Sequence, residues 1–200
     1  MIEIKDVHRR FGSRPVLAGA SWTFESGTVT YIEAPNGSGK TTLLRCLLGL
    51  VDCTGTITFD GRPRSMVRPS IAALFETPPV HPHLTGNQNL RVLSGPLADD
   101  GPLRRLLPDA SLLRRRVAGY SSGERKRLAL AGCLASAPAY VFLDEVDTGI
   151  DVDTLDVVAQ LIDELRGRST VILTGHNPDF YRHLADDVVE LREGEIHREY

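Results

Sequence analysis

The nine-residue stretch APNGSGKTT, residues 34–42, constrains the fold of this chain more than any other part of the sequence. It matches the pattern G-x-x-x-x-G-K-[ST], except that Ala34 replaces the first glycine. Gly37 and Gly39 have no Cβ, so the backbone can turn its N–H groups inward around a phosphate group. The first glycine of the pattern only eases entry into the turn, so we expect Ala34 to be tolerated. We interpret the stretch as a phosphate-binding loop.

The neighbouring residues support this interpretation. Lys40 supplies a positive charge for β- and γ-phosphates, and Thr41 supplies a hydroxyl for Mg²⁺. Residues 28–33 (TVTYIE) predict a strand, and residues 42–49 (TLLRCLLG) predict a short helix that ends at a glycine. This order of strand, loop and helix is the setting in which such a loop binds phosphate, and it disfavours the alternative of an ordinary glycine-rich turn.

Composition is that of a globular protein, with 200 residues, 42% hydrophobic and 24% charged. No internal repeat, low-complexity segment or linker divides the chain, so we expect one domain over residues 1–200. The net charge is -3, which provides no general attraction for nucleic acid, and no nucleic-acid partner is expected.

Cysteine use and the N-terminus indicate a cytoplasmic protein. Cys46, Cys53 and Cys133 are odd in number and form no C-x-x-C pair, so we expect reduced thiols. Residues 1–10 do not resemble a signal peptide. The longest uncharged run, residues 128–143, is shorter than the roughly 20 residues of a spanning helix and contains a proline.

The predicted elements indicate an α/β fold. Residues 2–7, 16–24 and 54–59 predict strands of an N-terminal antiparallel part. The continuous apolar runs 140–143 and 170–174 predict strands buried on both faces of a parallel sheet, and helices near residues 124–136 and 154–166 serve as crossovers.

A helical insertion interrupts this core between about residues 84 and 136, where leucines and arginines recur at helical spacing. A solvated helix face is the simpler interpretation of its arginines, and a docking patch is the alternative. These arginines are Arg104, Arg105, Arg114, Arg115 and Arg116.

Asp144 and Glu145 follow the predicted strand 140–143 directly. Ligands of parallel α/β folds bind at this edge of the sheet. Asp144 is suited to reach Mg²⁺, and Glu145 to orient and polarise an attacking water. A pair of acidic surface residues is the alternative, which the apolar strand before the pair disfavours.

Residues 120–127, YSSGERKR, narrow the choice among phosphate-binding folds. They resemble the L-S-G-G-Q signature of ATP-binding-cassette (ABC) ATPases, and like that signature they begin a helix shortly before the Asp-Glu strand. Residues from about 11 to 194 follow that family's order of motifs. The resemblance implies a P-loop NTPase core with a mainly parallel sheet, an N-terminal antiparallel β subdomain and a small helical insertion.

The resemblance also implies roles for individual residues. Phe11 matches the aromatic residue that stacks on adenine, although it could equally be a core residue. Ser121 and Gly123 match the signature residues that close over ATP bound by the other copy in a head-to-tail dimer. Asp151 matches the D-loop. The residues of the loop that would bind ATP are Asn36, Gly37, Ser38, Gly39, Lys40, Thr41 and Thr42.

The remaining implied roles concern the metal and the reaction. Thr41, Glu76 and Asp144 would hold Mg²⁺, with Glu76 standing where the family usually has glutamine. Glu145 and His176 would be catalytic, His176 as the switch histidine at the γ-phosphate. Because His176 follows the strand 170–174, we expect it at the same sheet edge as the carboxylates.

Several positions depart from the family pattern. Glu76 adds a negative charge near the γ-phosphate, which is tolerable if it binds Mg²⁺ directly. Ser122, Glu124 and Val146 replace a glycine, a glutamine and a proline of the pattern, which bears on turnover more than on ATP binding. His81 and His83 flank a proline without a third ligand, so we assign them no transition metal.

The resemblance implies an ATPase subunit of an ABC transporter that powers a separate membrane permease, with export favoured, as a homodimer or heterodimer. It would be cytoplasmic and peripheral on the inner face of the membrane. Residues 76–79 (ETPP) and 84–87 (LTGN) resemble the lantibiotic-immunity and bacitracin-type efflux subgroup. A haem-exporter ATPase subunit, a soluble ABC ATPase acting on ribosomes or DNA, and a degenerate ATP-binding scaffold are the alternatives.

Overall fold

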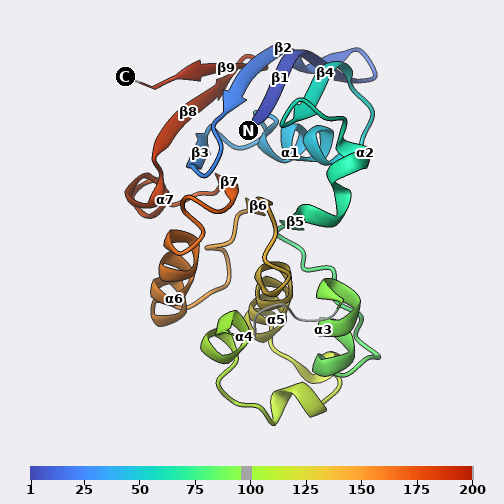
Figure 1. The fold of residues 1–200 in the computed structure, drawn as a ribbon, viewed down its shortest axis with the longest axis vertical. Coiled ribbons are helices and arrows are strands. Elements are labelled where there is room, and N and C mark those ends of the chain that lie inside the picture. The colour runs from blue at the N-terminus through green and yellow to red at the C-terminus, as the bar shows by residue number, and fades with distance from the viewer. Residues whose placement is uncertain (96–100, 200) are drawn as a thin grey trace.

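The computed structural model describes residues 1–95 and 101–199. Its strands, within those residues, form two sheets. In Figure 1 the sheets lie in the upper part of the molecule, and helices α3, α4 and α5 form a separate lobe below them. Residues 96–100 of the predicted helical insertion lie outside the described part.

The smaller sheet is antiparallel and has the order β2-β1-β4, where β1 is Ile2–Phe11, β2 is Arg14–Phe24 and β4 is Thr54–Phe59. Side chains alternate between its two faces, so Ile2 and Ile4 are buried. The predicted N-terminal antiparallel part is therefore confirmed, with longer β1 and β2 than the sequence indicated.

The larger sheet has the order β5-β6-β7-β3-β8-β9, and its neighbouring strands are parallel except for β8 and β9. Every residue of β6 and β7 is buried, as their continuous apolar runs predicted. The strands are β3 (Val29–Glu33), β5 (Ile71–Leu74), β6 (Tyr140–Asp144), β7 (Thr170–Thr174), β8 (Asp187–Arg192) and β9 (Glu195–Arg198).

Helices α1, α5 and α6 match the predicted helices and α3 and α4 lie in the predicted insertion, whereas α2, α7 and the β8-β9 hairpin come in addition to the predicted elements. The helices are α1 (Lys40–Leu48), α2 (Arg64–Val67), α3 (Gly86–Ser94), α4 (Gly101–Leu106), α5 (Ser122–Ala135), α6 (Val152–Asp163) and α7 (Pro178–Leu184), with 3₁₀ turns at Arg68–Ser70, Leu112–Arg114 and Val117–Gly119. Within residues 1–95 and 101–199, no helix has the length and apolar character needed to cross a membrane.

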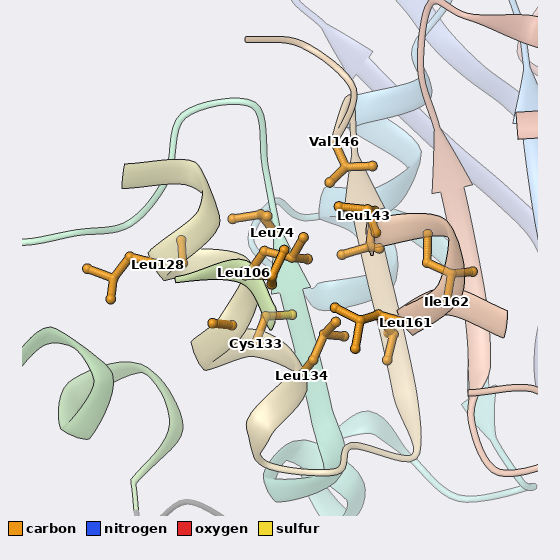
Figure 2. Packing of buried hydrophobic residues seen from close by; sticks show 14 of the residues in the cluster. Leu74, Leu106, Leu128, Cys133, Leu134, Leu143, Val146, Leu161 and Ile162 are labelled. Atoms are coloured by element: carbon orange, nitrogen blue, oxygen red, sulfur yellow. The ribbon is translucent and has the colours of Figure 1, made fainter. Parts of the chain in front are cut away.

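Strand β6 separates two apolar cores because its side chains alternate. Val141 and Leu143 pack with residues of α5 and α6, a packing seen around Leu143 and Leu161 in Figure 2. Tyr140 and Phe142 pack on the other side with α1 and the smaller sheet. Both faces of β6 are thus covered, and the strand end that carries Asp144 is held in place.

Candidate active site

The loop between β3 and α1 has the backbone geometry that its glycines predict. Gly37 and Gly39 have φ values of 75° and 112°, in the region that glycine adopts without strain. A Cβ on Gly39 would also lie 2.8 Å from Cγ1 of Val16. Ala34 is not among the residues with positive φ, so its methyl group is compatible with the turn.

Helix α1 begins directly after this loop, with Gly39 as its N-cap and no side chain capping it. The first N–H groups of α1 and the positive end of the helix therefore face the loop. Lys40 is 5% exposed, and its Nζ donates to the carbonyl oxygens of Ala34 at 2.6 Å and Pro35 at 3.3 Å. Burial lowers the pKa of Lys40, and Glu145 and Asp144 oppose this shift.

Asp144 lies at the end of β6 and is 2% exposed. Thr41 Oγ1 donates to Asp144 Oδ2 at 2.8 Å, and Thr174 Oγ1 donates to Asp144 Oδ1. Thr41 and Asp144, which the sequence placed together at a metal site, are therefore in direct contact. Thr174 was not predicted; it meets Asp144 because the two residues are paired in the parallel register of β6 and β7.

Glu145 and His176 form an ion-pair contact, with His176 Nε2 2.7 Å from Glu145 Oε1. Glu145 has a φ of 54°, a left-handed conformation that is rare for a residue with a side chain. Its N–H donates to the carbonyl oxygen of Thr174 at 2.9 Å. The two residues predicted to be catalytic thus emerge from adjacent strand ends and meet.

Lys40, Thr41, Glu145 and His176 line one cavity of about 580 Å³. Arg14 and Val16 of β2 also line it, although no sequence signal pointed to them. Glu76, which is exposed, lies on its wall after β5. The lining residues are Phe11, Arg14, Val16, Asn36, Gly37, Ser38, Gly39, Lys40, Thr41, Thr42, Glu76, Glu145 and His176.

Phe11 lies at the end of β1 and is 50% exposed, so it is not a core residue. The guanidinium carbon of Arg9 lies 4.5 Å from the ring centroid of Phe11. Arg9 Nη1 in turn donates to the carbonyl oxygen of Asp52 at 2.7 Å. Phe11 is therefore a supported aromatic ring at the cavity wall, within reach of a ligand.

The ABC transporter family model matches residues 17–148, more than half of the chain. The chain belongs to this family. It is an ATP-binding ABC transporter subunit with ATPase activity.

Individual relatives of this ABC ATPase align over almost its whole length. It is similar to the lantibiotic transport ATP-binding protein SrtF of Streptococcus pyogenes, with 29% identity over 98% of this chain and 89% of the relative. It is also similar to the tungstate uptake system ATP-binding protein TupC of Peptoclostridium acidaminophilum, with 30% identity over 98% of this chain and 96% of the relative.

Solved structures show the same fold. A dimeric ATP-binding cassette in a post-hydrolysis state, bound to ADP and phosphate, superposes with a TM-score of 0.86 and 22% identity over 100% of this chain and 98% of that chain. The α/β fold with an antiparallel N-terminal sheet and a mostly parallel second sheet is thus the ABC ATPase fold.

The signature segment of this ABC ATPase does not line the cavity. Ser121 is exposed and is the N-cap of α5, with its side chain accepting from Glu124 N–H at 3.1 Å. Glu124 Oε2 accepts from Ser121 N–H at 2.7 Å, which completes a capping box. Glu124, a departure from the family pattern, thus has a structural role. Gly123 lies in the first turn of the same helix.

Asp151, matched to the D-loop, caps α6. Its Oδ1 accepts from the Thr154 N–H at 2.9 Å, and its Oδ2 accepts from the Thr154 hydroxyl at 3.0 Å. These bonds hold the pKa of Asp151 below its usual value. Asp151 is exposed and stands outside the cavity.

The donor groups at the cavity fit both a triphosphate and a hard cation. Thr41 and Asp144 present oxygen atoms side by side, which is the ligand chemistry of Mg²⁺. Ser38 Oγ, in the loop, is buried and has no hydrogen-bond partner among the described residues. A buried hydroxyl without a partner is costly, and a bound phosphate oxygen would satisfy it.

Proposed function

We propose that this ABC ATPase binds Mg-ATP in the cavity at the loop of residues 34–42, hydrolyses it with Glu145, and powers transport through a separate membrane permease as one of two paired cassettes. One observation carries the proposal. Lys40, Thr41, Glu145 and His176 line one cavity and Asp144 contacts Thr41, while the signature segment stays outside the cavity.

The phosphates and the base of ATP would be bound by different elements. Lys40 and the N–H groups at the start of α1 would hold the β- and γ-phosphates, with Lys40 exchanging its present carbonyl partners for phosphate oxygens. Phe11, supported by Arg9, would stack on adenine. Asn36, Gly37, Ser38, Gly39 and Thr42 would complete the loop around the phosphates.

Thr41, Asp144 and Glu76 would hold the metal ion. Mg²⁺, when bound, supplies positive charge that offsets the negative charge of the transferring phosphoryl group. Thr41 and Asp144 are already in contact, whereas Glu76 lies on the cavity wall. Thr174 keeps Asp144 turned toward Thr41 by occupying its other oxygen.

Glu145 would act as the general base that orients and polarises the attacking water. His176 keeps the Glu145 carboxylate at the cavity by its contact at 2.7 Å, and is placed to reach the γ-phosphate. The Glu145 side chain is 16% exposed, so it is shielded from bulk water but open to the cavity.

The second cassette would be required to complete the site. Ser121 is exposed and Gly123 is partly exposed, and both lie in the lobe formed by α3, α4 and α5, outside the lining of their own cavity. A head-to-tail pair would bring the signature of one copy to the ATP of the other, so that ATP binding favours pairing and hydrolysis releases it. The second copy would be identical or a homologous subunit.

The partner would be an integral-membrane permease, which places the chain on the inner face of the membrane. Export is favoured because residues 76–79 and 84–87 resemble the lantibiotic-immunity and bacitracin-type subgroup, and because SrtF is a lantibiotic transport protein by name. TupC, an uptake protein by name, is equally similar to this chain. The proposed direction of transport therefore rests on residues 76–79 and 84–87.

Affinity purification from the native host tests the partner. The tagged chain, recovered in detergent with ATP, is expected to bring down a polytopic membrane protein in stoichiometric amount. A Lys40→Ala variant serves as the control for nucleotide-dependent association. Recovery with ribosomes or DNA and with no membrane protein would contradict the transporter role and support the soluble class of ABC ATPase.

A further inference from the structure

Lys126 is a buried lysine that no role described above uses. It lies on α5, one turn beyond the signature residues, and is 3% exposed. Its Nζ donates to the carbonyl oxygen of Glu145 at 2.5 Å and to that of Thr148 at 2.7 Å. Burial lowers the pKa of Lys126, while Asp147, Glu76, Glu145 and Asp144 oppose the shift. A lysine is seldom buried unless its charge has partners, so these two bonds determine where it sits.

The segment 145–148 needs such support because its backbone is strained. Glu145 has a φ of 54°, and a left-handed conformation at a residue with a side chain is strained and persists only where the surrounding contacts hold it. Within the segment, Thr148 N–H donates to the Glu145 carbonyl at 3.2 Å. The Glu145 carbonyl therefore accepts from two donors, one of them the Lys126 ammonium.

The other side of the segment is fixed by α7. The Tyr181 hydroxyl donates to Asp147 Oδ1, and the Asp147 N–H donates to the Tyr181 hydroxyl at 3.2 Å. Helix α5 also approaches the residue that follows the segment, since a Cβ on Gly123 would lie 3.2 Å from the Gly149 carbonyl oxygen. The segment is thus held between the helix that starts with the signature and the helix that follows His176.

We propose that Lys126 is a positioning residue for hydrolysis: by binding the carbonyls of Glu145 and Thr148 it holds the Glu145 backbone in the conformation that presents the carboxylate to the cavity and to His176. The inference rests on the proposed role of Glu145 as the base. It also links the signature helix to the chain's own hydrolytic carboxylate through one side chain, so displacement of α5 is passed to Glu145.

Substitution of Lys126 tests this role in the purified full-length chain. Lys126→Met keeps the apolar stem and removes both hydrogen bonds. We expect kcat to fall about 30-fold with KM for ATP within about twofold, because small misplacement of a catalytic group lowers the rate of the chemical step more than binding. Lys5→Met is the matched control, since Lys5 is exposed on β1 and pairs with Glu3.

Lys126→Gln separates hydrogen bonding from charge. Glutamine is neutral but keeps an N–H₂ donor, one bond shorter than the lysine ammonium. We expect its kcat to lie between those of the wild type and Lys126→Met, because one carbonyl can still be bound. A glutamine variant as slow as the methionine variant would overturn the hydrogen-bonding role. If the methionine variant does not fold in thermal denaturation, the glutamine variant carries the comparison.

A double-mutant cycle with Glu145→Gln decides whether Lys126 acts through Glu145. Hydrolysis of γ-labelled ATP is measured for both single variants and the double variant. If Lys126 positions the carboxylate, Lys126→Met should lower the residual rate of Glu145→Gln by less than about threefold. An equal loss in both backgrounds would overturn the inference while leaving the proposed function in place. Wild-type turnover by Glu145→Gln alone would instead refute the base role itself.

Discussion

The two halves of the proposed composite site differ in how far a single chain completes them. The half around the loop of residues 34–42 is assembled: Thr41 contacts Asp144, and Glu145 contacts His176. In the signature half, Ser121 is exposed and Gly123 is partly exposed, and Ser121 is hydrogen-bonded to Glu124 in the capping box of its own helix. The first half lines a cavity of its own chain, whereas the signature half lies outside that cavity.

The difference follows from where each half is anchored. The assembled half lies at the carboxyl ends of β3, β6 and β7, and the buried cores on both faces of the sheet fix those ends. The signature half belongs to the lobe of α3, α4 and α5 (Figure 1). The hydrogen bonds of Lys126 to the carbonyl oxygens of Glu145 and Thr148 connect the signature helix to the catalytic segment. We therefore expect that one chain can bind nucleotide, and that turnover needs the proposed pair.

Neutralising the catalytic carboxylate should have the largest effect. We expect Glu145→Gln to bind Mg-ATP with unchanged affinity and to lower kcat at least about 100-fold, because the general base is lost. Paired cassettes should accumulate, since hydrolysis no longer releases them. Phosphate release and light scattering measure the two effects, with Glu195→Gln, an exposed residue of β9, as control. Turnover equal to the wild type would remove Glu145 from the base role.

Mixing two inactive variants tests whether each half serves the other copy. Lys40→Ala damages the assembled half, and Gly123→Asp damages the signature half; an aspartate in the first turn of α5 is compatible with the helix. Each variant alone should lose most of its activity. An equal mixture should recover about a quarter of the wild-type rate. Random pairing makes half of the pairs mixed, and each mixed pair has one intact site out of two.

ATP binding by each variant alone serves as a control for the mixing experiment. Gly123→Asp should bind ATP as the wild type does, because the signature is outside its own cavity. Lys40→Ala should bind it weakly, because the loop loses its positive charge. Absence of recovery, with pairing still observed by light scattering, would contradict the head-to-tail arrangement.

The same two halves differ in how much of them the sequence could predict. The loop, the Asp144-Glu145 pair and His176 follow from local patterns at strand ends, and the structure brings them together. Thr174 could not be assigned to Asp144, because that contact depends on the register between β6 and β7. Tyr181 and Lys126 were missed for a similar reason: their partners are backbone groups or side chains at least 19 positions away.

Some structural features that we did not predict could have been recognised from a sequence pattern. Ser121 and Glu124 fit the S-x-x-E capping box, which explains the departure at Glu124 without reference to turnover. Strand β8 carries charges among its apolar residues, and α7 has only seven residues, so neither produced a clear period. The arginines of the insertion are not simply a solvated face, since Arg105 bonds Glu164 and Gln160 of the α6 region.

Substitution of Phe11 should have a more moderate effect, on the affinity of the assembled half for ATP. We expect Phe11→Ala to weaken ATP binding about fivefold, because aromatic stacking contributes about 1 kcal/mol. Phe11→Trp should retain affinity, and kcat at saturating ATP should be unchanged in both variants, since adenine lies away from the reacting phosphate. Titration calorimetry with ATP measures the affinities. Equal affinity of the alanine variant and the wild type would leave Phe11 as a ring that supports Arg9.

Substitution of Glu76 should have the smallest effect. It tests whether Glu76 belongs to the metal ligands of the assembled half. Its carboxylate is exposed and borders the cavity after β5, so solvent and salt screen its charge. We expect Glu76→Gln to retain Mg-ATP binding and to raise the Mg²⁺ concentration for half-maximal hydrolysis about threefold, because one anionic ligand is lost. With chelator present, ATP alone should bind the variant slightly more tightly, since a like charge near the γ-phosphate is removed. Identical Mg²⁺ titration curves would show that Glu76 is not near the ion, and Thr41 and Asp144 would then be the metal ligands that this chain contributes.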